Sequence, residues 1–352
     1  MVMTNKHNYR INMYKIAVII PTLNEEKFIA KCLDSIIAQT FAFADMDVIV
    51  VDGGSHDRTQ DIVEDYCRRW HNIRFIHNSG KIQSIAFNIG MKCSDAPYIA
   101  RMDAHTTYDR DYIRHCIDIY AGHNELNGCT PEEVGNVGGV CRILPQHPGL
   151  MAETSAVLNK SRFGIGGAAF RVGAPAGCVD TVPFGCFPRK LLDKIGGMHE
   201  DLPRGEDNEI NSRIRRSGYK VYLDPAIVST YYSRDTLKGN LRQMYANGVS
   251  IGHLFYVDRE SIGVRHLVPL AFVTCLTGGL CLSWVCRYVA MLLVLMLIIY
   301  AACNLVASAM VALRHGYKFF LPISGLFLLT HLVYGSGTIV GLITGYGKFK
   351  LR

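Results

Sequence analysis

Apolar runs alternate with amphipathic segments over residues 15–250 of the chain. Short continuous apolar runs are typical of strands that a parallel sheet buries on both faces. Between the runs, Phe28–Ile37 places apolar residues at the spacing of an amphipathic helix, and a second helix is predicted to begin near Gln83. This alternation predicts an α/β domain with a doubly wound parallel sheet. The predicted strands are Lys15–Pro21, Asp47–Val51, Ile73–His77 and Tyr98–Met102.

The C-terminal part of the chain has a different pattern, because charged residues almost disappear after residue 266. The uncharged runs are Leu267–Cys286, Tyr288–Leu313 and Phe319–Gly347. Each approaches or exceeds the roughly 20 residues that a helix needs to cross a bilayer. The alternative is that these runs form buried core helices, and the succession of three such runs disfavours that alternative. We therefore expect two or three transmembrane helices and leave their topology open.

The pattern is looser between about residue 135 and the apolar runs. Glycine-rich stretches at 164–167 and 171–173 predict a flexible loop near an active site, and an ordinary surface loop is the alternative. Helices are predicted at Arg189–Ile195, from Gly205 through Arg216, and over Leu237–Gly248. The last of these is expected to lead the chain to the membrane. The expected domains are a tail over 1–14, a catalytic domain over 15–250 and a membrane-anchoring region over 251–352.

Composition and net charge indicate the compartment of the protein and the kind of partner it binds. The N-terminus lacks the apolar stretch of a cleavable signal peptide, so we expect the catalytic part to stay in the cytoplasm. The 12 cysteines are scattered without a Cys-x-x-Cys pair, which favours reduced thiols. The net charge of +7 suits an anionic partner such as a nucleotide sugar, a lipid phosphate or an anionic leaflet. No basic stripe with interleaved aromatic residues is present, so nucleic acid is not an expected partner.

Isolated acidic residues follow the apolar runs at three points. Asp52 and Asp103 each come after a predicted strand, and Glu206 and Asp207 open a predicted helix. Open α/β sheets bind ligands at the carboxyl ends of their strands. Three carboxylates at such an edge suit nucleotide recognition, metal binding and proton abstraction.

The first acidic position, Asp52, belongs to a set of residues that are candidates for nucleotide binding. Backbone donors and side chains of Pro21, Thr22, Asn24 and Glu25, directly after a buried strand, can cradle a nucleobase. Asp52 can accept hydrogen bonds from a uracil ring or a ribose. Its alternative role is to cap the turn that follows it, as Asp does routinely.

The second acidic position belongs to an Asp-Ala-His segment. In an extended chain Asp103 and His105 point to the same side, so both are candidate ligands for Mg²⁺ or Mn²⁺. Such an ion would neutralise a departing diphosphate. The alternative is a capping Asp beside a surface His. Lys81 and Arg101 are candidate phosphate contacts, although lone basic residues are usually exposed.

The third acidic position opens a helix, where the helix dipole alone favours carboxylates. The functional interpretation makes Asp207 a general base that deprotonates an acceptor hydroxyl as it attacks an anomeric carbon. Glu206 would then shape the acceptor pocket.

Taken together, these motifs resemble a known family. Val18–Glu26, Val50–Thr59, Asp103-Ala104-His105 and Gly205-Glu206-Asp207 stand in the order seen in family 2 glycosyltransferases of the GT-A fold. The resemblance implies a Rossmann-like sheet domain that binds a nucleotide-diphosphate sugar, followed by C-terminal transmembrane helices. Residues 163–167 and 179–185, with the apolar helices, look like the subgroup that makes succinoglycan-type exopolysaccharide.

The resemblance also implies roles. Asp52 would bind uridine, Asp103 the diphosphate and metal, and Asp207 would be the base of an inverting displacement. His105 replaces the second Asp of the usual Asp-x-Asp. Arg242-Gln243-Met244-Tyr245 does not match the Gln-x-x-Arg-Trp motif of processive members, which favours transfer of a single sugar.

The substrates and setting that the resemblance implies are a donor such as a UDP-sugar and a polyprenyl-linked acceptor. The enzyme would be a multi-pass protein of the inner (plasma) membrane with its catalytic domain in the cytoplasm, and other glycan-assembly proteins are candidate partners. One alternative transfers the sugar directly onto polyprenyl phosphate. Another is an inactive, membrane-tethered nucleotide-sugar binder. A dinucleotide-binding oxidoreductase is disfavoured, because no Gly-x-Gly-x-x-Gly follows the first strand.

Overall fold

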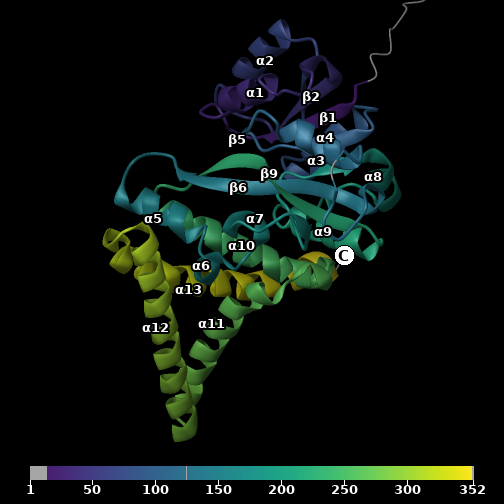
Figure 1. Cartoon of the computed structure of the whole chain (residues 1–352). Helices are drawn as coiled ribbons and strands as arrows, with labels where there is room; N and C mark the ends of the chain where they lie inside the picture. Colours follow the sequence, from purple (N-terminus) through teal and green to yellow (C-terminus); the bar gives the residue numbers. More distant parts are fainter. Residues whose placement is uncertain (1–13, 124, 351–352) are drawn as a thin grey trace, which may run out of the picture.

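The computed structural model describes residues 14–123 and 125–350, which form a sheet domain set on a base of long helices (Figure 1). Nine strands form one sheet in the order β3-β2-β1-β4-β8-β6-β9-β5, with β7 paired to β9. Their bounds are β1 Ile16–Thr22, β2 Met46–Asp52, β3 Ile73–His77, β4 Tyr98–Arg101, β5 Thr106–Tyr108, β6 Val134–Pro145, β7 Gly177–Val179, β8 Cys186–Pro188 and β9 Lys220–Ser233.

The sheet is parallel only over its first four strands. Strands β3, β2, β1 and β4 pair in parallel, as predicted, and each begins and ends within one residue of its predicted bounds. Beyond β4 the expectation of a parallel doubly wound sheet is wrong, because β8 runs antiparallel to β4 and β6 antiparallel to β8. The long strands β6 and β9 then run parallel to each other, and β5 and β7 add to β9 antiparallel.

Helices cover both faces of the parallel half. The helices of the sheet domain are α1 Ile29–Ile37, α2 Thr59–Arg69, α3 Gln83–Lys92, α4 Tyr112–Tyr120, α5 Leu150–Leu158, α6 Arg162–Ile165, α7 Ala169–Val172, α8 Arg189–Ile195 and α9 Glu206–Arg216. Successive residues of β1 point to opposite faces, so Val18 packs with Leu33 of α1 while Ile19 packs with Phe87 of α3. Burial on both faces explains why the strand is apolar throughout. The twelve cysteines are free thiols, as predicted.

The glycine-rich region is more ordered than the predicted loop. Its two stretches overlap the ends of the short helices α6 and α7, which are followed by Gly166 and Gly173 with φ of +76° and +74°. Glycine adopts this left-handed conformation without steric cost, so these residues terminate helices as well as loosening the chain.

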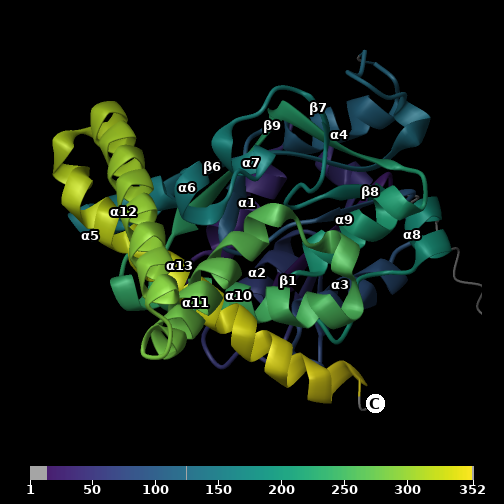
Figure 2. The same cartoon turned by 90° about the horizontal axis from the view of Figure 1, so that it is seen from below.

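Four long helices complete the chain: α10 Leu237–Val257, α11 Val264–Ser283, α12 Arg287–His315 and α13 Phe320–Gly345. The predicted helix at 237–248 continues to Val257, so the expected domain boundary at residue 250 falls inside α10. Three candidate spans are long and apolar enough to cross a membrane: Val264–Ser283, Arg287–His315 and Tyr317–Phe349. Figures 1 and 2 show that α11 and α12 form a projecting hairpin, whereas α13 lies beneath the sheet domain alongside α10.

The contact between α10 and α13 is built on glycine. Gly248 and Gly252 of α10 lie against the backbone of α13, and a Cβ atom at Gly248 would lie 2.1 Å from the Tyr334 carbonyl oxygen. A Cβ atom at Gly341 would lie 2.2 Å from the Val249 carbonyl oxygen. Small residues spaced four apart let helix backbones touch in this way. The third apolar helix is therefore fixed to the sheet domain.

Replacing Gly341 by Ala should weaken this contact. The added methyl group would force α13 away from α10, at a cost of about 1–3 kcal/mol. Gly325→Ala on the same helix is the matched control, because nothing lies within 4 Å of a Cβ atom there. We expect the melting temperature of the detergent-solubilised full chain to fall for Gly341→Ala only. Equal melting temperatures for the two variants would contradict the packing described here.

Candidate active site

The carboxyl ends of the parallel strands meet at one edge of the sheet. Thr22 at the end of β1 lies in register with Asp52 at the end of β2, and the Gly53 N–H donates to the Thr22 carbonyl oxygen at 2.8 Å. Asp103 follows β4, the other neighbour of β1. The structure thus brings these strand-end acids to a common rim, as the sequence predicts.

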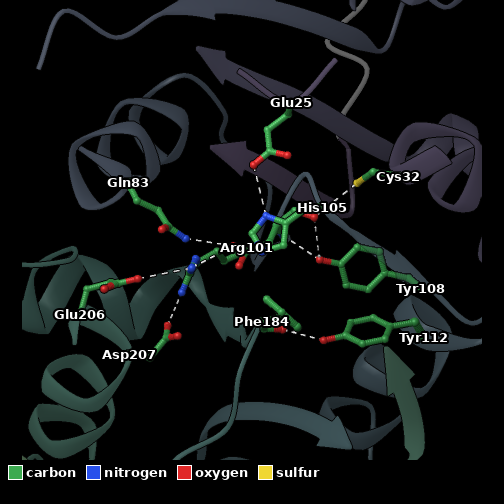
Figure 3. Close-up of polar contacts among 11 residues, drawn as sticks. Glu25, Cys32, Gln83, Arg101, His105, Tyr108, Tyr112, Phe184, Glu206 and Asp207 are labelled. Atoms are coloured by element: carbon green, nitrogen blue, oxygen red, sulfur yellow. Dashed lines mark hydrogen bonds and ion pairs between the residues drawn. The ribbon is translucent and has the colours of Figure 1, made fainter. Parts of the chain in front are cut away.

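A buried arginine organises the acids. Arg101, the last residue of β4, lies with its guanidinium 2.9 Å from Asp103 Oδ1 and 3.3 Å from Glu206 Oε1, and it also pairs with Asp207 (Figure 3). Only 2% of Arg101 is exposed. It was predicted to contact a phosphate, but in this structure the guanidinium is occupied by three carboxylates.

Two of these carboxylates have perturbed acidity. Burial raises the pKa of Glu206 to about 7, where Arg101 opposes the shift and the charge of Asp207 adds to it. Burial also raises the pKa of Asp207, again against the effect of Arg101. The side chain of Glu206 is 7% exposed and that of Asp207 is 34% exposed. Asp207 is therefore the more accessible of the two, and its raised pKa suits proton transfer.

The backbone before α9 sets the position of these acids. Gly205 has φ of +82°, and a Cβ atom there would lie 2.5 Å from Ser250 Oγ on α10. The same hydroxyl donates to the Arg204 carbonyl oxygen at 2.7 Å. Glycine is needed at this turn both for its conformation and for its close approach to α10. The acids at the start of α9 are thus held against α10, the helix that precedes the long apolar helices.

Asp103 and His105, which were predicted to point to the same side of an extended chain, contact different residues. Residues 103–105 lie in a turn between β4 and β5 and are not extended, so the premise that places both side chains on one side is wrong. Asp103 Oδ1 accepts from Gln83 Nε2 at 2.9 Å, whereas His105 Nδ1 lies 3.2 Å from Glu25 Oε1 (Figure 3). Burial lowers the His105 pKa, but the Glu25 hydrogen bond and the charges of Asp103 and Glu25 outweigh it and raise the pKa overall.

The side chains around Asp103 and His105 show whether a divalent ion fits this site. Within residues 14–123 and 125–350 no group of three or more His, Cys, Asp or Glu side chains could hold a metal ion. Mg²⁺ is commonly bound through one or two carboxylates together with substrate phosphates. Asp103, Glu25 and His105 line one cavity and match that partial ligand set.

Two cavities meet around these residues. One of about 300 Å³ is lined by the turn after β1 and by residues around Lys81. The other, of about 360 Å³, is lined by Arg101, Glu206 and Asp207 and extends to residues of α7, α10, α11 and α13. Both cavities are lined by Gln83, Asp103, His105 and Pro203.

The predicted donor-binding residues are distributed unevenly around the smaller cavity. Lining it are Pro21, Thr22, Glu25, Lys81 and Asp103. Asn24 and Asp52 are not among its lining residues. The Asn24 carboxamide accepts from the His56 N–H at 2.9 Å, and the buried Asp52 carboxylate accepts from the Gly54 and Ser55 N–H groups at 2.9 and 2.8 Å. Asp52 thus caps its turn, the alternative role considered for it, and its uridine contact stays a prediction.

Sequence reasoning missed several residues of the larger cavity. Gln83 Nε2 donates to Asp103 Oδ1, and Gln243 Nε2 donates to the Tyr231 hydroxyl at 2.9 Å. Arg171, Arg234 and Arg265 also line this cavity. No motif marks these positions, because they come from separate elements that only the tertiary fold brings together.

Comparisons with known proteins agree with this arrangement. Residues 17–169 match the model of the family described as glycosyl transferase family 2. The chain is 25% identical over 338 residues to a Methanococcus voltae protein named dolichyl N-acetyl-alpha-D-glucosaminyl phosphate 3-beta-D-2,3-diacetamido-2,3-dideoxy-beta-D-glucuronosyltransferase, covering 95% of this chain and 99% of that protein. It is also 25% identical over 266 residues to succinoglycan biosynthesis protein ExoA of Rhizobium meliloti, covering 75% of this chain and 77% of that protein.

A solved structure shares the fold. The mannosyltransferase PcManGT from Pyrobaculum calidifontis, in complex with GDP-Man and Mn²⁺, superposes with a TM-score of 0.57 at 17% sequence identity. The match covers 90% of this chain and 85% of that one. It supports a GT-A sheet domain, which here is followed by long apolar helices.

Replacing Arg101 by Met should destabilise the protein strongly. Removing the cation leaves three carboxylates close together without a positive partner, a change that costs about 3–5 kcal/mol for a buried pair. Arg68→Met is the control, because Arg68 and its partner Asp65 are both exposed and such pairs contribute at most about 1 kcal/mol. Thermal unfolding of the full chain measures both, and adding Glu206→Gln to Arg101→Met should restore part of the loss. A similar loss for Arg101→Met and Arg68→Met would contradict this electrostatic role.

Proposed function

Because this chain is a glycosyltransferase with a family 2 domain of the GT-A fold, we propose that it transfers a single sugar to a lipid-linked saccharide at a membrane surface. The donor would be a nucleotide-diphosphate sugar, and the product a lipid-linked intermediate of an exopolysaccharide or another cell-surface glycan. The reaction would invert the configuration at the anomeric carbon. The domain limits proposed are 15–250 for catalysis and 251–352 for membrane anchoring.

The observation that carries the proposal is the meeting of two cavities at Asp103, with Asp207 on one side only. The smaller cavity takes the donor, with its nucleotide against Thr22 and Lys81. The transferred sugar then lies where both cavities are lined by Gln83 and Asp103. The larger cavity, which contains Asp207 and reaches α11, takes the acceptor.

The names of similar proteins guide the choice of substrates. The Methanococcus voltae relative is named for a dolichyl-phosphate-linked sugar, which supports a lipid-linked acceptor here. The Pyrobaculum calidifontis structure contains a nucleotide sugar, which supports a donor of that class. We propose a UDP-sugar as the donor, with uridine bound by the turn that Asp52 caps.

The chemistry then follows from the side chains at the meeting point. An acceptor hydroxyl oxygen attacks the anomeric carbon from the side opposite the diphosphate, and the bond from that carbon to the diphosphate oxygen breaks. The hydroxyl proton passes to the Asp207 carboxylate, and the nucleoside diphosphate leaves with the bonding electron pair. Direct displacement from the opposite side inverts the configuration. Glu206 lies beside the base and shapes the acceptor side of the cavity.

A divalent cation fits the donor side. Asp103, with Glu25 or His105, would hold Mg²⁺ or Mn²⁺ beside the donor diphosphate, and the Mn²⁺ in the Pyrobaculum calidifontis structure supports this assignment. When bound, the ion would supply positive charge to the departing diphosphate. Gln83 and Arg101 orient Asp103 for this role by occupying its Oδ1 atom.

The carboxylate cluster favours a saccharide hydroxyl over polyprenyl phosphate as the nucleophile. A phosphate ester is already ionised near neutral pH, since its second pKa is about 6, and it needs no general base. It would also be repelled by Asp103, Glu206 and Asp207, which outnumber Arg101 in charge. A neutral hydroxyl needs a base and is not repelled. The acids therefore support an acceptor that presents a sugar at this point.

The helices suggest how the enzyme sits in the membrane. We propose that the α11–α12 hairpin enters the bilayer while α10 and α13 lie at its surface. With about 1.5 Å of rise per residue, the 20 residues of α11 match the hydrocarbon thickness of about 30 Å. Trp284 and Tyr288 are exposed at the hairpin tip, where aromatic residues favour the far interface.

The end of the described chain contacts the sheet domain. Lys348 Nζ donates to the Asp201 carbonyl oxygen at 2.6 Å, so Lys348 would lie on the same side of the membrane as the sheet domain. We propose that this side is the cytoplasmic face of the plasma membrane.

Asp207→Asn should abolish most sugar transfer and leave donor binding unchanged, because the amide cannot accept the proton. General-base catalysis typically contributes about 10²–10⁴-fold in rate. The measurement is a donor screen with purified full-length protein, a lipid-linked saccharide and Mg²⁺ or Mn²⁺, with Asp193→Asn on exposed α8 as the control. A chelator should stop transfer by the wild type.

Three outcomes would count against the proposal. Transfer by Asp207→Asn at the wild-type rate would remove Asp207 from the mechanism. Full activity in the presence of the chelator would remove the metal role of Asp103. Donor binding without turnover on any lipid-linked acceptor would favour the inactive binder.

The rate of transfer should fall at acid pH. The base must be ionised, and burial holds the pKa of Asp207 above its usual range, so activity rises as pH increases through that raised pKa. The pH below which kcat/KM falls should therefore be higher than for an exposed aspartate. The Glu206→Gln variant should keep this acid limb of the pH profile. If the limb disappears in Glu206→Gln, the base is Glu206.

A further inference from the structure

The larger cavity combines two regions of different charge. Its acidic lining residues are Asp103, Glu206 and Asp207, which surround Arg101. The same cavity is also lined by three basic residues, Arg171 of α7, Arg234 after β9 and Arg265 of α11. The proposed chemistry at Asp207 does not use these three arginines.

The three arginines are only partly neutralised. Arg265 pairs with Asp180 at 2.6 Å. Arg171 has neutral partners, since it donates to Asn159 Oδ1 at 2.8 Å and its guanidinium lies 5.3 Å from the Phe170 ring centroid. In the part of the chain that the structure describes, neither Arg171 nor Arg234 forms an ion pair with an acidic side chain. A positive charge of about two thus stays available to a ligand.

A buried donor without a partner lies beside them. His266 Nε2 accepts from Arg265 Nε at 3.2 Å, which leaves the proton of a neutral imidazole on Nδ1. That Nδ1 atom is buried and has no hydrogen-bond partner among the described residues. His266 also lines the cavity. Buried donors are rarely left unpaired, so this one points to a ligand with acceptor oxygens.

The arginine side lies where the cavity meets the membrane helices. Arg265 and His266 belong to the first turn of α11, and Tyr334 of α13 lines the cavity beside them. Figure 1 shows this turn at the junction of the sheet domain and the projecting hairpin. The loop before α7 packs on Arg265, because a Cβ atom at Gly166 would lie 3.0 Å from Arg265 Cδ. The Arg265 side chain is therefore held by this loop and by its ion pair with Asp180 at the start of the first long apolar helix.

We propose that Arg171, Arg234 and Arg265, with His266, bind the diphosphate that joins the lipid to the saccharide of the acceptor. This inference rests on the proposed function, because it assigns the acceptor of the same site. Guanidinium groups bind phosphate oxygens through paired, charge-assisted hydrogen bonds. The polyprenyl chain follows α11 and α13 into the bilayer, and the saccharide extends from the diphosphate toward Asp207. The arginines thus select phosphate-bearing lipids by supplying the positive charge that the acids near the base lack.

The test is equilibrium binding to the full chain in nanodiscs of zwitterionic phosphatidylcholine. The probes are a polyprenyl diphosphate without a sugar, the matching polyprenol, and phosphatidylglycerol. The variants are Arg171→Gln, Arg234→Gln and Arg265→Gln. Arg242→Gln is the control, because Arg242 is an exposed residue of α10 that does not line the cavity, and the change removes one positive charge.

We expect the wild type to bind polyprenyl diphosphate and to discriminate against polyprenol and phosphatidylglycerol. Each cavity variant should lose roughly tenfold to a hundredfold in affinity for the diphosphate, as for hydrogen bonds to charged groups. Arg242→Gln should bind as the wild type does, and the donor affinity of every variant should be unchanged. These binding results identify the subsite whether or not sugar transfer is observed.

Opposite results would overturn the inference. If the cavity variants bind polyprenyl diphosphate as the wild type does, the arginines do not hold it. Equal binding of phosphatidylglycerol would make the subsite a general anchor for anionic lipid and would equally reject the acceptor assignment. Arginine-dependent binding without turnover on any acceptor would instead reject the proposed function and leave the diphosphate subsite in place.

Discussion

The site depends on a buried arginine that is shared by three carboxylates. Arg101 ends β4 and binds Asp103 on one side and the first two residues of α9 on the other, and the second of these, Asp207, is 106 positions along the chain. Without a cation, three carboxylates at this distance would repel one another in a site with little access to water. The same guanidinium therefore stabilises the junction between the parallel strands and α9, and it limits the rise that burial causes in the pKa values of Glu206 and Asp207.

This junction also divides the substrates in the proposed reaction. Asp103 lies at the meeting point of the two cavities, while Asp207 lines only the larger one. The glycine contacts between α10 and α13 then hold the larger cavity against the membrane helices. In the proposed reaction, a saccharide carried by a lipid would reach the base through that side, and the nucleotide would be bound at the sheet edge.

Sequence patterns predicted the features that depend on local order. Continuous apolar runs predicted the four parallel strands, because strands buried on both faces need apolar residues at every position. The long uncharged runs predicted two or three transmembrane helices, and the described residues contain three candidate spans. The pairing of Arg101 with Asp207 could not be predicted, since it depends on how distant elements meet. The metal-binding geometry of Asp103 and His105 was misjudged because the segment turns where an extended chain was assumed. The fixed position of α13 was missed because its apolar composition hides the glycine contacts with α10.

The arrangement of substrates around Arg101 is the central claim. It is tested most directly by a cryo-electron microscopy structure of the full-length Asp207→Asn variant with the donor sugar bound. The account predicts the nucleotide in the smaller cavity against Thr22 and Lys81, with the anomeric carbon facing residue 207 across the meeting point of the cavities. A donor nucleotide bound among Arg171, Arg234 and Arg265 would contradict it.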